Sequence, residues 1–482
     1  MAGWRLEHTY AQLPELFHTA VMPTPVEEPH LVIFNRPLAS LLGLDARALD
    51  GSEGTAIFAG NALPDGARPL AQAYAGHQFG HFTVLGDGRA ILLGEQITPS
   101  GERFDIQLKG AGRTRYSRGG DGRAALGPML REYIVSEAMH ALGIPTTRSL
   151  AVTLTGEPVF REDVLEGAVL TRVAASHIRV GTVQWAAANR NHDALRALAD
   201  HTRARHYPEL LDAPEPYAAL FDAIVERQAR LIARWQLVGF VHGVMNTDNM
   251  ALSGETIDYG PCAFMDAYDP ATVFSSIDHG GRYAYGNQPP IAQWNLARLG
   301  EAMLPLFGSD GARAIERANA SLQRFQERFE RHWLQGMRAK LGLFTEEAED
   351  ITLVNDLLAW MQQRSADFTN TFRTLTHAPL TDAEAQADDD FAAWARRLQQ
   401  RRARQPQPEA ECEALMRRHN PAVIPRNHKV EEALAAATGP HDYAVMHRLL
   451  EVLSRPYDHD RDLPEFTAPP RLPGGYRTFC GT

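Results

Sequence analysis

The middle of the chain reads His242-Gly243-Val244-Met245-Asn246-Thr247-Asp248-Asn249 and then, after a short interval, Ile257-Asp258-Tyr259-Gly260. The second run supplies a carboxylate at Asp258 and the first a carboxamide at Asn249. Carboxylate and amide oxygens are hard ligands that suit Mg²⁺ when the ion also bridges phosphate oxygens. These two runs therefore predict a site for metal-bound phosphate groups.

The spacing of these residues matches the catalytic loop of protein kinases, His-x-Asp-x-x-x-x-Asn, which is followed by Asp-Phe-Gly. His242 and Asn249 have the required separation, and Asp258 precedes an aromatic residue and a glycine. Val244, however, stands where a kinase has its catalytic aspartate, and the nearest carboxylate is Asp248. Either the base has moved to Asp248, or the chain binds nucleotide without ordinary kinase chemistry.

The residues before this loop predict the strand-rich lobe that a kinase-like fold requires. Residues 82–85 and 90–95 read as two strands of a hairpin that turns at residues 86–89. Residues 104–109, 149–154 and 168–173 read as further strands, and residues 128–142 as a helix. In the turn, Gly86 and Gly88 would allow a phosphate to approach the backbone beside Arg89, although Gly-Asp-Gly is also an ordinary hairpin turn.

Lys109 ends a predicted strand, where a positive charge inside a cleft would attract a phosphate. In kinases such a lysine pairs with a glutamate on the following helix. Glu132 and Glu137 are both available on residues 128–142, and the helical wheel alone favours Glu137. The alternative is a surface lysine whose aliphatic part covers apolar residues.

A glycine- and arginine-rich loop follows this lysine over residues 110–123, GAGRTRYSRGGDGR. Backbone amides and guanidinium groups together suit diphosphates and triphosphates. Arg172 and Arg179 add two more cations further along the chain. A solvated basic loop is the alternative.

The remaining sequence is mainly helical. The first 70 residues look irregular, and residues 192–204, 217–236, 296–306, 312–340, 353–372, 409–418 and 429–437 have helical periodicity. Residues 380–408 read as a surface helix pair and linker, before an irregular tail. We therefore expect an α+β chain with an N-terminal extension (1–75), a nucleotide-binding lobe (76–180), a helical lobe with the catalytic and metal-binding loops (181–340) and a C-terminal helical region (341–482).

The composition of the chain argues against several classes of protein. The chain of 482 residues has a formal net charge of −11, which disfavours nucleic acid as a partner. Its three cysteines, Cys262, Cys412 and Cys480, are too few for a disulfide scaffold and have no zinc-site spacing. We find no secretory signal and no apolar run long enough to span a membrane, so a cytoplasmic protein is expected.

Several longer strings resemble the selenoprotein O (YdiU) family of protein adenylyltransferases. These are residues 107–110 (QLKG), 117–124 (SRGGDGRA), 136–146 (SEAMHALGIPT), 242–250 (HGVMNTDNM) and 257–261 (IDYGP). The resemblance implies a protein-kinase-like fold that binds ATP in the reverse orientation. AMP would then pass to a Ser, Thr or Tyr hydroxyl of a protein, and pyrophosphate would leave.

The resemblance also assigns roles to residues. Asp248 would be the catalytic base, Asn249 and Asp258 would hold Mg²⁺, and Lys109 would contact phosphate and pair with Glu132. The nucleotide site would comprise Gly86, Gly88, Arg89, Lys109, Asp121, Gly122, Arg172, Arg179 and Asp258. The family's C-terminal cysteine is linked to redox control, which raises a pairing of Cys480 with Cys262; a free, buried Cys262 is the alternative.

Three other functions stay open at this stage. A kinase with a relocated base would release ADP instead of pyrophosphate. A nucleotide-binding pseudokinase scaffold would bind ATP without turnover. Transfer of UMP from UTP, with Mn²⁺ in place of Mg²⁺, would use the same residues.

Overall fold

The computed structural model describes residues 2–377, 388–470 and 476–478. Its largest sheet is antiparallel at every pairing between strands. In spatial order the main strands are β2 (His18–Ala20), β4 (Leu70–Gln72), β7 (Ala90–Ile97), β8 (Arg103–Lys109), β11 (Val164–Ala174), β10 (Arg148–Phe160) and β3 (His30–Phe34). β1 (Leu6–Glu7) adds to β7, and β9 (Ala124–Ala125) adds to β11.

Alternation along β8 separates an apolar face from a polar one. Ile106 and Leu108 are fully buried in an apolar cluster with residues of β7 and β11. Asp105, Gln107 and Lys109 point to the opposite face, because successive strand residues alternate. They are buried as well. The sheet thus presents a row of buried polar groups on one face.

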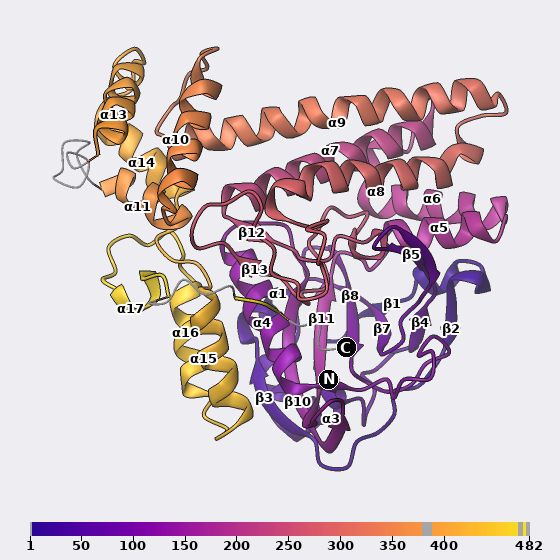
Figure 1. Cartoon of the computed structure of the whole chain (residues 1–482). Coiled ribbons are helices and arrows are strands. Elements are labelled where there is room, and N and C mark those ends of the chain that lie inside the picture. The colour runs from indigo at the N-terminus through magenta and orange to yellow at the C-terminus, as the bar shows by residue number, and fades with distance from the viewer. Residues whose placement is uncertain (1, 378–387, 471–475, 479–482) are drawn as a thin grey trace.

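Helix α4 (Leu126–Ala141) packs across β10 and β11. Leu130 and Ile134 are fully buried in a cluster shared with α15 (Asn427–Thr438) and α16 (Ala444–Leu453). In Figure 1 the yellow α15 and α16 lie beside α4, so the C-terminal part of the chain supports this helix.

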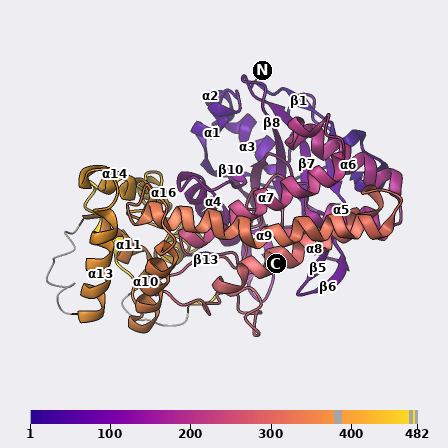
Figure 2. The same cartoon turned by 90° about the horizontal axis from the view of Figure 1, so that it is seen from above.

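A layer of helices lies opposite the polar face of the sheet (Figures 1 and 2). It contains α5 (Val180–Ala188), α6 (His192–His206), α7 (Pro216–Leu237), α8 (Gln288–Met303) and α9 (Gly311–Lys340). The long α9 lies along α7, and their apolar faces share one core cluster. The short strands β12 (Phe240–Val241) and β13 (Ala263–Phe264) pair with each other and flank the predicted catalytic loop.

A further group of helices surrounds a separate apolar cluster: α10 (Asp350–Arg364), α11 (Phe368–His377), α13 (Asp389–Arg402) and α14 (Glu409–His419). The short α17 (Pro464–Thr467) instead contributes Phe466 to the cluster around α4. The single helix expected over 353–372 is wrong. Ser365 adopts a left-handed φ of 49°, which ends α10 and separates it from α11. Part of the expected helix pair over 380–408 lies outside the described residues.

Two other expectations were wrong. The first 70 residues are not irregular: besides β1–β4 they form α1 (Arg36–Leu41), α2 (Ala46–Leu49) and α3 (Ser52–Ala59). Residues 82–85 and 90–95 do not form a hairpin, because β6 (His81–Val84) pairs with β5 (Ala75–Gln78). The expected turn instead folds inward, since the buried carboxylate of Asp87 accepts hydrogen bonds from Gln72 N and Gln107 Nε2.

Candidate active site

A cleft of about 380 Å³ opens between the polar face of the sheet and the helical layer. Every residue that the sequence predicts for the nucleotide, the metal or catalysis lines it. These residues are Gly86, Gly88, Arg89, Lys109, Asp121, Gly122, Arg172, Arg179, Asp248, Asn249 and Asp258. The predicted supporting residue Glu132 does not line the cleft but lies behind Lys109.

Asp258 is the centre of an ionic cluster at the base of this cleft. Its Oδ1 accepts hydrogen bonds from Lys109 Nζ at 3.1 Å and Arg172 Nη1 at 2.5 Å, and its Oδ2 from Arg179 Nη1 at 2.9 Å. Burial opposes ionisation of this carboxyl, but Arg172, Lys109 and Arg179 outweigh burial and hold its pKa well below the usual range. A left-handed φ of 62° at Asp258 is uncommon for a residue with a side chain and indicates a constrained site.

The structure pairs Lys109 with Glu132, at 2.6 Å between Nζ and Oε2. Glu137, which the helical wheel favours, instead binds the guanidinium of Arg148 and accepts a hydrogen bond from Asn35. The wheel fails because Arg148 engages Glu137, which leaves Glu132 to pair with Lys109.

Gln107 is a site residue that the sequence analysis missed. Its Oε1 accepts hydrogen bonds from Arg172 Nη2 at 2.6 Å and Nε at 3.2 Å, and its Nε2 donates to Asp87 Oδ2 at 3.2 Å. Gln107 and Arg172 are register partners on β8 and β11, which explains their contact. A polar residue between Ile106 and Leu108 in a buried strand is the signal that could have revealed it.

A second missed element is the hairpin of β5 and β6, which lies against the predicted catalytic loop. His77 N donates to Thr247 Oγ1 at 2.7 Å, and Phe79 N donates to Asn246 Oδ1 at 3.1 Å. Tyr74, just before β5, places its ring 4.4 Å from the guanidinium carbon of Arg179. The sequence signal was the run Ala75-Gly76-His77-Gln78-Phe79-Gly80, in which glycines flank polar groups.

Asp248 is buried beneath this hairpin. Within the described part of the chain its Oδ1 has no hydrogen-bond partner. Burial raises the pKa of Asp248 to about 6, against the opposing effect of Arg179. A carboxylate with a pKa near neutrality and a hydrogen-bonding loop that fixes it has the properties of a general base.

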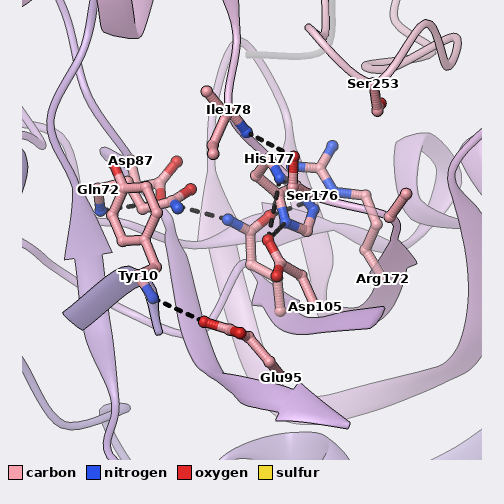
Figure 3. Close-up of polar contacts among 12 residues, drawn as sticks. Tyr10, Gln72, Asp87, Glu95, Asp105, Arg172, Ser176, His177, Ile178 and Ser253 are labelled. Atoms are coloured by element: carbon pink, nitrogen blue, oxygen red, sulfur yellow. Dashed lines mark hydrogen bonds and ion pairs between the residues drawn. The ribbon is translucent and has the colours of Figure 1, made fainter. Parts of the chain in front are cut away.

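Buried polar side chains, among them Asp105 and His177, lie near Arg172 (Figure 3). Asp105 Oδ2 accepts a hydrogen bond from His177 N at 2.9 Å and contacts His177 Nδ1 at 3.0 Å, and its Oδ1 accepts from Arg205 at 2.6 Å. Burial lowers the pKa of His177 to about 4, so this ring is neutral at physiological pH. The carbonyl of His177 in turn accepts a hydrogen bond from Arg179 Nε at 3.3 Å, which connects these side chains to the cleft.

Comparison with known proteins places this geometry in a family. The family model described as "Protein adenylyltransferase SelO" matches residues 3–454. A protein of Halalkalibacterium halodurans named "Protein nucleotidyltransferase YdiU" is 62% identical over all of this chain and 98% of its own length. A protein of the same name from Geobacillus kaustophilus is 60% identical over the whole of both chains.

The chain belongs to the SelO family. It is therefore an enzyme of the nucleotidyltransferase class. A third relative of the same name, from Syntrophotalea carbinolica, is 60% identical over all of this chain and 98% of its own length. The expected resemblance is thus confirmed.

The basic loop of this SelO-family chain is shaped by glycine. Gly122 has a φ of 72°, and a Cβ there would lie 2.1 Å from the carbonyl oxygen of Gly112. Asp121 beside it accepts hydrogen bonds from Arg161 and from Arg123 N. The loop therefore places Arg118 and Arg123 in the lining of the cleft.

The donor groups of the SelO-family cleft fit a divalent cation only together with phosphate. Asn249 donates from Nδ2 to Val244 O at 2.9 Å, which leaves its Oδ1 as an acceptor, and Asp258 lines the same cleft. Among the described residues no cluster of three His, Cys, Asp or Glu side chains could hold a metal alone. One carboxylate and one amide oxygen are a donor set suited to Mg²⁺ that keeps phosphate and water ligands.

The thiol of Cys262 is fully buried, and burial raises its pKa to about 11. Cys480, its expected partner, lies outside the described residues, so the pairing stays a prediction.

Over the described residues of this SelO-family chain, none of the helices combines the length and apolarity needed to cross a membrane.

Proposed function

We propose that this enzyme transfers AMP from ATP to a Ser, Thr or Tyr hydroxyl of a protein. The oxygen of the hydroxyl forms a bond to the α-phosphorus, the bond from that phosphorus to the bridging oxygen of the β-phosphate breaks, and pyrophosphate leaves. The names of the family and of the relatives support nucleotidyl transfer to protein. The Asp258 cluster is the single observation in the structure that carries the proposal.

Three cations meet at the base of the cleft, namely Lys109, Arg172 and Arg179. A kinase-like cleft that transfers the γ-phosphate needs that group near its open end. Buried guanidinium groups instead suit an anion of high charge that is held deep in a medium of low dielectric constant. We infer that the β- and γ-phosphates occupy this end, which leaves the α-phosphate facing Asp248 in a reversed ATP orientation.

The proton balance then involves Asp248. The attacking hydroxyl loses its proton to the Asp248 carboxylate, whose raised pKa of about 6 suits a base that is ionised at neutral pH. Asn249 and Asp258 would hold Mg²⁺, or Mn²⁺ in its place. When bound, the ion would neutralise charge on the phosphate oxygens. Lys109, fixed by Glu132, would orient the polyphosphate for in-line attack.

We also propose that the molecule is a two-lobed, protein-kinase-like fold, with a nucleotide-binding lobe over 76–180 and a helical lobe over 181–340. Residues 1–75 and 341–482 would be additions to that core. The order of catalytic loop, Asp-Tyr-Gly run and Lys–Glu pair supports this assignment. The cytoplasmic location stays a prediction from composition.

A competition experiment tests the nucleotide and the acceptor. Purified enzyme with a mixture of candidate protein substrates receives equal concentrations of ATP and UTP, with Mg²⁺ or Mn²⁺ in separate reactions. Mass spectrometry then identifies the group attached and the residue that carries it. The proposal requires AMP on Ser, Thr or Tyr with either ion. UMP as the dominant adduct would assign the enzyme to uridylyl transfer, and phosphate adducts would assign it to the kinases.

A further inference from the structure

A second groove, of about 670 Å³, lies away from the cleft and shares none of its lining residues. It is bounded by the C-terminal end of α4, by α7, by the last turns of α9 and by the end of α14. The cleft belongs to the proposed reaction, but nothing in that reaction uses this groove. Its lining gathers basic side chains from α7, α9 and α14.

Three of the arginines there lack an acidic partner. Arg230 and Arg234 lie one turn apart on α7, and Arg418 lies in the last turn of α14. Across the residues that the structure describes, none of the three forms an ion pair with a carboxylate. Arg234 donates only to the carbonyl oxygen of Gly143, at 3.0 Å. Burial and the neighbouring charge of Arg230 lower the pKa of Arg234.

Most other charged groups of the groove have partners, except Lys340, which is buried with its Nζ 4.2 Å from the ring centre of Phe372 and has no carboxylate partner among the described residues. Arg338 binds Asp350 at 2.7 Å and Glu346 at 3.0 Å. His332 contacts Glu226 at 2.5 Å. The acidic residue Glu346 is therefore engaged by Arg338, and the three arginines supply most of the uncompensated charge of the groove, beside the buried Lys340, whose pKa burial lowers to about 7.

Such a cluster attracts an anion. Like charges one turn apart on a helix destabilise it, and this chain has an excess of acidic residues that could have neutralised them. Guanidinium groups bind phosphate oxygens through paired, charge-assisted hydrogen bonds. Groups from two helices on opposite sides of a groove can surround a small anion on more than one side.

We propose that this groove is a second anion site, which binds a small phosphorylated molecule between α7 and α14. Arg230 and Arg418 contact its phosphate oxygens, and Arg234 contributes the adjacent positive charge. The ligand is multiply charged, because three guanidinium groups line one groove. It is an inorganic polyphosphate or a small phosphate ester, and the site acts independently of the nucleotide cleft.

Calorimetric titration of the full chain with inorganic pyrophosphate tests the site, without metal and at constant ionic strength. Arg230 and Arg418 are exposed, so Arg230→Ala combined with Arg418→Ala should preserve the fold, which a melting curve checks. Wild type should show two binding components, and the double variant should lose one or weaken it at least tenfold. Arg313→Ala, on an exposed arginine of α9, is the matched control and should retain both.

Two further titrations show which site produces each binding component. Lys109→Ala should weaken the cleft component and leave the groove component unchanged. A parallel titration with inorganic phosphate separates the two sources: equal affinity indicates a site for one phosphate group, and weaker affinity indicates a polyphosphate or ester site. An isotherm of the double variant that superimposes on that of the wild type would overturn the proposal.

Discussion

The carboxylate of Asp248 lies directly against the α-carbon of Gly76. A Cβ built on Gly76 would come within 2.1 Å of Asp248 Oδ1 and 2.7 Å of its Cγ, which no side chain can tolerate. The hairpin of β5 and β6 therefore determines where the proposed base lies, because its backbone limits the position of the carboxylate.

Gly76→Ala should displace Asp248 and reduce kcat by about 100-fold, since a shift of about 1 Å in a catalytic group has that scale of effect. Gly280→Ala is the matched control, because a Cβ there meets nothing within 4 Å. Steady-state kinetics and a melting curve on both variants check the prediction. Full activity in Gly76→Ala would show that the position of Asp248 does not matter for the reaction.

The pH profile should show the ionisation of Asp248. Because burial raises its pKa to about 6, kcat should rise about tenfold per pH unit below pH 6 and level off above it. Asp248→Asn should lose about 100-fold or more of the activity and this slope. The same raised pKa means that the contribution of Asp248 to folding stability is largest below about pH 4 and is lost as the pH rises through 6.

Asp87 is the necessary control for that profile, because burial also raises its pKa to about 6. Asp87→Asn should keep the inflection if Asp248 is the base. An inflection that disappears in Asp87→Asn and persists in Asp248→Asn would reverse the assignment.

Gln107→Leu should weaken nucleotide binding about tenfold, because Arg172 loses two hydrogen bonds that fix its guanidinium. The effect should appear in KM for the nucleotide more than in melting temperature. Thr153→Val provides a comparison at a fully buried position of β10, where the hydroxyl has no partner among the described residues. Equal nucleotide affinity in Gln107→Leu and wild type would remove Gln107 from the site.

Cys262 should resist alkylation in the folded enzyme. Its thiol is fully buried and its pKa is raised to about 11, so the thiolate population at neutral pH is more than about 100-fold below that of a free cysteine. Peptide mass spectrometry after iodoacetamide treatment, with and without urea, measures this. Rapid labelling of Cys262 in native buffer would contradict the buried position.

The sequence allowed the composition of the cleft to be predicted because its motifs are continuous. Residues 117–124 and 242–250 each contribute several cleft residues from one short run, and residues 107–110 contribute Lys109. Glycine positions, hard oxygen ligands and arginines are chemically specific, so their roles could be inferred before their positions were known.

The missed features depend on contacts between distant residues. The pairing of β6 with β5 and not with β7 follows from the inward position of Asp87, which needs Gln72 and Gln107 as partners. Lys109 pairs with Glu132 and not with Glu137 because Glu137 binds Arg148, which lies on a strand that comes later in the chain. Neither partner can be identified from local periodicity.

The most direct test is to incubate the enzyme and a protein substrate with Mg²⁺ and ATP labelled at either the α- or the γ-phosphate. Asp258→Ala serves as the control, because that carboxylate is the proposed metal ligand at the centre of the cationic cluster. The account predicts that protein retains only the α-label and that Asp258→Ala abolishes this retention. Retention of the γ-label would show phosphoryl transfer and would contradict the proposed nucleotidyl transfer.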